Sequence, residues 1–523
     1  MPIPWLSFLV FFPLAAAALI ALMPRSAERS VRLWATVAAA AEFVFSLPLW
    51  WRLIPGMPHF QFEERLDWIP AIGAQYHLGV DGISGLLALL TTFMTFIAVL
   101  GAWTSVEKRG REFFALILAL EAGMLGTFFC LDLLLFYVFW EAMLIPMYLL
   151  IGIWGGHRRV YAAVKFFLYT MAGSVLMLIA ILSLYFMQKN MTGVATFDLQ
   201  AFYQMPIAPE QQFWLFLAFA FAFAIKVPMW PVHTWLPDAH VEAPTAGSVI
   251  LAAVLLKMGT YGFLRFAMPL FPNALQQCGP WIAWISIIGI VYGALVAMVQ
   301  TDIKKLVAYS SVSHMGFCML GLMAMNPQGF AGAMMTMLNH GISTGALFLL
   351  VGVIYERRHT RKIADFGGLW KVIPVFSVTF LVVTLSSIGL PATNGFIGEF
   401  LILLGASRHD MAWAVVAALG VILSACYMLW MYQRVVFGPV THEENAKLAD
   451  LTLRERLVFF PLLVLIFWMG VAPQPFLDRM QPALDRTLQL TNDRAAAAGR
   501  YVGQLVREST PASTTTDATG GGQ

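Results

Sequence analysis

The sequence predicts an all-α, polytopic membrane protein with about 14 transmembrane helices, in which two inverted five-helix repeats each contain a broken helix. Three observations lead to this prediction. Of the 523 residues, 59% are hydrophobic and only 12% are charged, whereas about one quarter of the residues in a soluble domain are charged. Apolar segments of about 20 residues, the length that spans a bilayer, recur along the chain. Basic residues gather in alternate connections between those segments.

The apolar segments start near the N-terminus and continue to residue 472. We interpret the first as a spanning helix and not as a signal peptide, because no basic residue precedes it and its apolar run is about 20 residues long. The predicted spans are 4–23, 31–51, 84–104, 112–131, 133–152, 161–187, 211–231, 244–270, 279–300, 306–325, 328–355, 371–404, 411–436 and 455–472.

The basic residues predict the orientation of these spans. With an even number of spans both termini lie on one side of the membrane. The connections on the opposite side and their edges then hold 18 Lys and Arg residues, against four in the connections on the terminal side. Because cytoplasmic loops are enriched in Lys and Arg, both termini are expected on the outer side. Five Arg residues after the last span oppose this bias, but they follow every span and should influence insertion less.

Two of the predicted spans are interrupted by proline. The seventh runs into Pro228 and the twelfth contains Pro391. Proline removes a backbone donor and clashes with the preceding turn, so we expect helix breaks at both positions. The broken helix is the fourth in spans 4–8 and again the fourth in spans 9–13. This correspondence in position suggests a duplicated unit, and an odd number of spans puts tandem copies in opposite orientations.

These features divide the chain into five predicted parts. Residues 1–104 hold the first three spans, 105–270 form the first repeat and 271–436 form the second. Residues 437–508 contain the fourteenth span and an amphipathic segment. Residues 509–523 are rich in Ser, Thr and Gly with almost no apolar content, so they are expected to be disordered.

Seven ionisable side chains are predicted at mid-membrane depth, counted at about 1.5 Å per residue across roughly 30 Å of hydrocarbon. A charge at the centre of the bilayer costs about 2.5–3.5 kcal/mol on insertion scales, so these groups should face one another or water. They are Glu121 in the fourth span, Glu141 in the fifth, Lys257 in the eighth, His314 in the tenth, His340 in the eleventh, and Lys226 and Glu399 beside the two breaks.

This row of groups predicts a proton relay. Burial disfavours the charged form of a lysine and a nearby carboxylate favours it. A change in the distance between Glu141 and Lys226 would therefore switch the lysine between binding and releasing a proton. The two histidines can accept and pass protons near neutral pH. Lys257 continues the line, and Glu399 is the expected exit group.

Each of these groups also has a purely structural interpretation. Glu141 could pair with a lysine and fix two helices together, and His314 and His340 could be hydrogen-bond partners between helices. Glu121 could support a neighbouring group instead of taking a direct part. A structural ion pair alone would not need five or more buried ionisable groups, which favours transfer.

Other functional classes find little support in the sequence. The small net charge of +3 makes nucleic acid an unexpected partner. The four cysteines show no paired spacing, and no glycine-rich nucleotide motif follows a strand, so we expect no metal or cofactor in this chain. The segment 231–242 offers two histidines and two carboxylates, but their spacing matches no standard ligand set. An ordered loop before a helix start is preferred there.

The residues around the first break resemble a known family. The stretch from Ala224 to Ile250 (AIKVPMWPVHTWLPDAHVEAPTAGSVI), followed by KMGTYG from Lys257, is similar to the hallmark of the proton-conducting antiporter-like subunits. These occur in respiratory complex I, in membrane hydrogenases and in multisubunit Na⁺/H⁺ antiporters. The resemblance covers roughly residues 110–440. An antiporter or hydrogenase subunit and a non-conducting scaffold remain as alternatives.

Within complex I the resemblance is to the M-type subunits. The segment LLLFYVFWEAMLIPMY from Leu133 is similar to their fifth helix, NGFIGEF from Asn394 places glutamate where L- and N-type subunits carry lysine, and the chain ends soon after the fourteenth span. The resemblance implies that Glu141 and Lys226 are the coupling pair. It also implies L-like and N-like chains as neighbours in the membrane arm, and lipids are expected around the chain in a bacterial inner membrane. With the orientation that the basic residues predict, both termini are periplasmic. Quinone, NADH, FMN and iron–sulfur clusters would be bound only by partner subunits.

Overall fold

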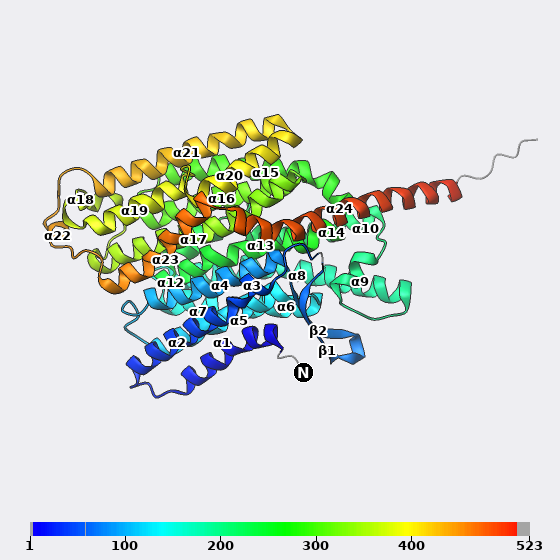
Figure 1. The fold of residues 1–523 in the computed structure, drawn as a ribbon, viewed down its shortest axis with the longest axis horizontal. Helices are drawn as coiled ribbons and strands as arrows, with labels where there is room; N and C mark the ends of the chain where they lie inside the picture. Colours follow the sequence, from blue (N-terminus) through cyan, green and yellow to red (C-terminus); the bar gives the residue numbers. More distant parts are fainter. Residues whose placement is uncertain (1–3, 58, 510–523) are drawn as a thin grey trace, which may run out of the picture.

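The computed structural model describes residues 4–57 and 59–509, which form a bundle of roughly aligned helices (Figure 1). The N-terminal helices are α1 (Trp5–Leu22), α2 (Glu28–Ser46), α3 (Pro48–Arg52) and α4 (Gly82–Gly101). The next group is α5 (Gly110–Phe129), α6 (Leu133–Ala142), α7 (Leu144–Trp154), α8 (Arg159–Thr192), α9 (Leu199–Gln204), α10 (Pro209–Lys226), α11 (Trp235–Glu242), α12 (Thr245–Ile250), α13 (Leu256–Gly262) and α14 (Met268–Leu270).

The second half of the chain also consists mainly of long helices. It contains α15 (Pro272–Met298), α16 (Ile303–Met323), α17 (Pro327–Arg358), α18 (Leu369–Val372), α19 (Pro374–Ser387), α20 (Asn394–His409) and α21 (Met411–Val436). The chain continues through α22 (Glu443–Ala446) and α23 (Leu453–Val471) into α24 (Gln474–Ser509). The residues from 510 onwards, which belong to the segment predicted to be disordered, lie outside the described part.

Eleven described helices are long and apolar enough to cross a membrane, or up to 12 if the bent pair α23–α24 counts as one span. The predicted count of fourteen is therefore not confirmed, although each predicted segment contains a helix. The shortfall has local causes. Helix α10 has polar residues at both ends, α19 is only 14 residues long, and the first turn of α23 carries three charged side chains.

A two-stranded hairpin is an addition to the all-α prediction. Strands β1 (Gln61–Ile69) and β2 (Ala74–Val80) pair antiparallel and lie, with α9, toward the end of the bundle opposite to α18 and α22 (Figure 1). Arg65 bonds to Asp198 at 3.2 Å, and His77 lies 3.4 Å from the same carboxylate. Burial would raise the pKa of Asp198, but His77 and Arg65 hold that pKa below its usual value. These contacts attach the hairpin to the bundle.

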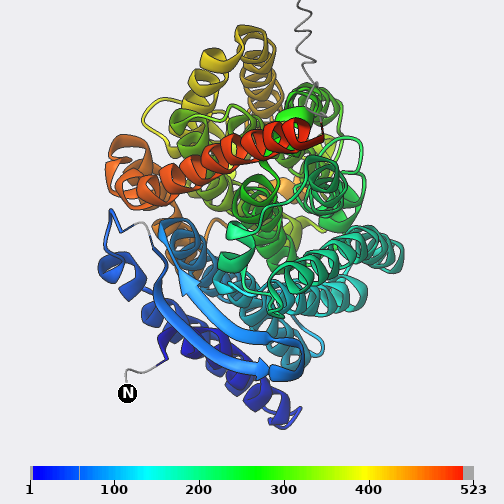
Figure 2. The same ribbon diagram turned by 90° about the vertical axis from the view of Figure 1, so that its right-hand side faces the viewer.

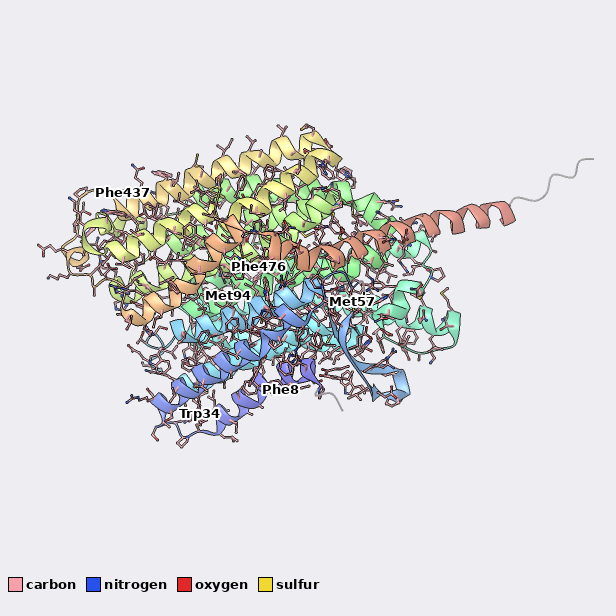
Figure 3. The ribbon with its side chains drawn as sticks, in the orientation of Figure 1. Phe8, Trp34, Met57, Met94, Phe437 and Phe476 are labelled. Carbon is pink, nitrogen blue, oxygen red and sulfur yellow. The ribbon has the colours of Figure 1, made fainter. Side chains whose placement is uncertain are left out.

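Large apolar side chains are exposed on the outer surface of the bundle, and ionisable side chains lie on its buried central helices. Trp34 and Phe437, labelled near the edge of the bundle in Figure 3, are 60% and 48% exposed. Large apolar side chains in such positions suit contact with lipid. Every residue from Ala246 to Leu270 is buried, and α16 and α17 are almost entirely buried. These central helices carry Lys257, His314 and His340.

Both proline-containing segments are interrupted between two helices, and an ionisable residue lies near each interruption. Helix α10 ends at Lys226, and Pro228 lies in the turns before α11. Helix α19 ends at Ser387, and Pro391 lies in the turn before α20. The indole of Trp235 donates to the carbonyl of Ile225 at 2.8 Å, which satisfies one acceptor that the end of α10 leaves free.

Helix α24 lies across the bundle and contacts both halves of the chain. It packs against α4, α14, α15 and α17, and Figure 2 shows it crossing the end that also carries the hairpin. Arg494 donates hydrogen bonds to the carbonyls of Met205 and Leu270, and Arg479 donates to the carbonyl of Trp50.

Candidate functional site

Lys257 and His340 are in direct contact in the centre of the molecule. Lys257 lies on α13 and is completely buried, and its Nζ is 2.6 Å from Nδ1 of His340 on α17. The ammonium also donates to the carbonyl of Ala252, which belongs to the π-helical stretch Leu251–Leu255. Such widened turns are frequent at functional sites. One imidazole and one backbone carbonyl therefore hold the lysine head.

A second contact joins His314 on α16 to Glu399 on α20. Nδ1 of His314 is 2.8 Å from Oε1 of Glu399. The rings of His314 and His340 are edge-on, with their centroids 5.7 Å apart, and Nε2 of each ring is buried without a hydrogen-bond partner. Lys257, His340, His314 and Glu399 therefore form one row that runs from α13 to α20.

A small polar cavity of about 20 Å³ lies against this row. Both histidines, Glu399, Asn339, Ser343 and Ser386 contribute to its lining. One water molecule needs about 10–15 Å³, so the cavity has room for a water that could bond the free imidazole nitrogens. Asn339, Ser343 and Ser386 also bond to Asn394 at the start of α20. The polar lining is thus tied to the second helix break.

Close packing of α17 on α20 sets the position of Glu399. A Cβ atom at Gly332 would lie 2.6 Å from the amide nitrogen of Ile402, and one at Gly398 would lie 2.8 Å from the amide nitrogen of Thr336. The backbones can approach this closely only because both positions are glycine. Since Gly398 precedes Glu399, the same contact fixes the carboxylate opposite α16 and α17.

We expect Gly398→Ala to separate α20 from α17 and to cost about 1–3 kcal/mol of stability through overpacking. Because Glu399 moves with α20, proton translocation should fall as well. The melting temperature of the purified protein and translocation in reconstituted vesicles measure the two effects. Gly110→Ala is the matched control, because an added Cβ there has no neighbour within 4 Å. Equal behaviour of the two variants would contradict this account.

Glu141 and Lys226 lie in the part of the chain predicted as the first repeat. Glu141 lies on α6, where the Ser174 hydroxyl and the Lys226 ammonium interact with its carboxylate. Lys226 is buried, its Nζ has no hydrogen-bond partner, and it lies 4.9 Å from the ring centroid of Trp140. The two charges therefore interact across a gap and not in a direct ion pair. A small movement of either side chain would change the strength of that interaction.

The segments that carry Lys226 and Lys257 are tightly packed on each other. A Cβ atom at Gly259, two residues after Lys257, would lie 2.8 Å from the amide nitrogen of Val227, the residue after Lys226. The Glu141–Lys226 pair and the Lys257 row therefore lie on adjoining backbone segments, although no direct hydrogen bond joins the two lysines.

Two buried histidines near this junction were not predicted as site residues. His240 stacks on Phe348 and interacts electrostatically with Lys257 and Lys304, and neither of its ring nitrogens has a hydrogen-bond partner. His233 is likewise buried and unpartnered. The sequence predicts an ordered loop for residues 231–242, but Trp235–Glu242 forms helix α11, so the prediction is wrong for that part of the segment. Prolines lie close to both histidines in the sequence and predict a loop. Because loops usually lie on the surface, the sequence did not indicate that these histidines are buried.

Glu121 lies apart from this row. It is completely buried on α5, and the charged group with which its carboxylate interacts is Glu42 on α2. Glu42 was not among the predicted site residues. The same depth argument that selected the other groups would have included it, since it lies inside the predicted span 31–51.

The fold and the row of contacts define a class of protein: a polytopic membrane chain whose core holds linked proton donors and acceptors. Comparison with known proteins agrees with this class. The chain belongs to the NADH:quinone oxidoreductase/Mrp antiporter transmembrane family, which matches residues 130–425.

Individual relatives extend the likeness over most of the chain. Subunit M of the NADH-quinone oxidoreductase of Rhodobacter capsulatus is 49% identical, with 92% of this chain and 96% of that protein covered. A chain of respiratory complex I from Thermus thermophilus is 34% identical with a TM-score of 0.85, covering 93% of this chain and 99% of that one. A chain of the Mrp complex from Dietzia is 21% identical with a TM-score of 0.80, covering 95% of this chain and all of that one, which shows a shared fold.

Proposed function

We propose that this chain is an M-type, antiporter-like subunit in the membrane arm of a respiratory NADH:quinone oxidoreductase. In this role it moves protons through the membrane, and the driving redox chemistry takes place in other subunits. The observation that carries the proposal is the row Lys257, His340, His314 and Glu399, whose two direct contacts lie in the buried centre of the bundle.

The geometry supports a specific transfer along the second half. The Lys257 ammonium can pass a proton to Nδ1 of His340 across their 2.6 Å contact. His340 can release its other proton from Nε2, and a water in the adjoining cavity can carry it to Nε2 of His314. His314 then donates from Nδ1 to Glu399. Each imidazole gains a proton at one nitrogen and loses one at the other, so its charge is restored after each transfer.

The Glu141–Lys226 pair would control the entry of protons into this row. When the carboxylate approaches, the lysine is stabilised in its charged form, and when it withdraws, burial favours release of the proton. Lys226 and Lys257 lie on adjoining segments, so a proton released at the first can recharge the second through intervening water. Five residues, Glu141, Lys226, Lys257, His314 and Glu399, are the proposed transfer groups, with His340 as the link between two of them.

The proposed setting follows from the same evidence. Exposed apolar faces suit lipids and neighbouring L-like and N-like chains. The basic connections at the α18 and α22 end favour a cytoplasmic location for that end, and we propose a bacterial inner membrane with both termini periplasmic. Quinone, NADH, FMN and iron–sulfur clusters would reside in partner subunits. The four cysteines are all free, and no described group of three or more His, Cys, Asp or Glu could hold a metal. The two halves, 105–270 and 271–436, would each supply one half-channel.

A Na⁺/H⁺ antiporter or membrane-hydrogenase subunit is the second candidate. Isolation of the chain from native membranes distinguishes the two. We expect flavin and iron–sulfur subunits to co-purify, and NADH oxidation by reconstituted vesicles to drive proton movement. Co-purification with small antiporter subunits instead, with proton movement coupled only to a Na⁺ gradient, would contradict the proposal.

A further inference from the structure

Two buried glutamates on neighbouring helices interact electrostatically in the N-terminal part of the bundle, away from the row described above. Glu42 on α2 and Glu121 on α5 are both 0% exposed, and their carboxylates interact electrostatically. Helices α2 and α5 pack directly on each other. None of the four carboxylate oxygens has a hydrogen-bond partner. Buried polar groups are normally paired, so this arrangement requires an explanation.

No cation in the described chain is placed to neutralise the pair. Helices α1 and α4 pack against both α2 and α5, and neither contains a charged residue. The nearest basic residues along the helices are Arg32, Arg52 and Arg111, each ten residues from one of the glutamates. That separation corresponds to about 15 Å of helix. The Arg32 guanidinium also donates a hydrogen bond to the carbonyl of Val106 at 3.0 Å.

The other ionisable groups on elements packed against α5 are few. Helix α6 contributes Tyr137 and Glu141, whose carboxylate interacts with Ser174 and Lys226. Helix α7 contributes Tyr148, and strand β2, which also packs on α5, contributes Tyr76 and His77. Helix α5 lies close to the junction of α6 and α7, because a Cβ at Gly123 would be 3.1 Å from the Cβ of Met143. Glu121 therefore lies near the depth of Glu141, but the carboxylate with which it interacts electrostatically is that of Glu42.

We propose that Glu42 and Glu121 form a second proton-binding site, in which two carboxyl groups hold at least one proton between them. An unpaired buried carboxylate costs several kcal/mol even after the protein relaxes. Two such charges beside each other cannot both persist, and a shared proton removes the repulsion and supplies a hydrogen-bond donor. This site is independent of the proposed relay.

A proton fits this site better than a metal ion. Calcium takes six to eight oxygen ligands, and magnesium demands octahedral geometry. The described residues offer no third carboxylate, histidine or cysteine beside the pair. The surface groove next to Glu42 on α1 and α2 is lined by apolar side chains only, including Ala38 and Ala41. The site therefore lacks the donors that would complete a cation shell.

Infrared spectroscopy of the intact purified complex tests the proposal. We would compare the natural protein with Glu42→Gln, Glu121→Gln and the double variant, since glutamine keeps the shape of the side chain without a titratable group. The spectrum of the natural protein minus that of the double variant should contain the carbonyl stretch of a protonated carboxylic acid. Glu444→Gln is the control, because Glu444 is exposed and paired with Arg358. Its difference spectrum should contain carboxylate bands and the bands of the new glutamine amide, but no band of a protonated carboxylic acid.

Each possible outcome of this experiment either supports or overturns the proposal. Loss of at least one carboxylic-acid band in the double variant supports the site, and loss of carboxylate bands alone overturns it. If the double variant does not assemble, each single variant should still show a protonated acid at its remaining glutamate, and an ionised group there would overturn the proposal. Conversion of the acid band to carboxylate on addition of Na⁺ would assign the pair to a cation instead. None of these results depends on whether the chain transports protons.

Discussion

Replacing Lys226 with alanine is expected to lower NADH-driven proton translocation by about tenfold or more, equivalent to at least about 1.4 kcal/mol on the transfer barrier. Lys226 is buried without a hydrogen-bond partner, and its ammonium is the cation with which Glu141 interacts. Its loss would remove the group proposed to bind and release the proton and would leave the glutamate without a counter-charge. Translocation per electron, measured with a pH-sensitive dye in vesicles that contain the whole complex, is the readout.

Two further lysine variants identify the cause. Lys226→Arg keeps a positive charge beside Glu141, but the guanidinium does not release a proton. We expect this variant to assemble normally and still fail to translocate. Lys189→Ala removes an exposed lysine at the end of α8 and should have no effect. Full translocation by Lys226→Arg would show that the lysine is only a structural charge.

His340→Asn is expected to have a comparable effect for a different reason. The asparagine oxygen can still accept a hydrogen bond from Lys257, but the side chain has no nitrogen pair that can gain and lose protons. The row would be cut between Lys257 and His314, whose ring lies 5.7 Å from that of His340. General acid–base groups typically contribute about 10²–10⁴-fold, so a loss of about tenfold or more is a conservative expectation.

The histidine variant is compared with His442→Ala, which removes an exposed imidazole near α22. Electron transfer from NADH is recorded in the same preparation, so that loss of assembly is separated from loss of translocation. An unchanged ratio of protons to electrons in His340→Asn would mean that water connects Lys257 to His314 without the imidazole, and the proposed row would then be wrong.

The sequence alone predicts which ionisable groups are buried, but not how they meet. A charge inside an apolar run is visible without a structure, and this is how Lys257 and Glu399 were selected. The contacts of the row join residues 83 and 85 positions apart. They depend on how α13, α16, α17 and α20 pack, and periodicity within one helix holds no information about that packing.

Three features were missed for separate physical reasons. The hairpin was missed because β1 carries Glu63, Glu64 and Arg65 and its register is irregular, so the segment has no clean alternation of apolar and polar residues. His240 was missed because prolines surround it. Glu42 carries the same signal as Glu121, but the sequence does not show that α2 packs on α5 and brings the two carboxylates into electrostatic interaction.

Helix α24 limits the kinds of motion that transport can use. It joins elements of both halves, since Arg494 bonds to carbonyls after α9 and at the end of α14 while the helix also packs along α17. A transporter that works by rocking one half against the other would have to break these contacts of α24 in every cycle. Rotamer changes and the entry and exit of water do not disturb it. The chain is therefore built to shift protons inside a nearly rigid frame, and loosening α24 should not by itself open a path.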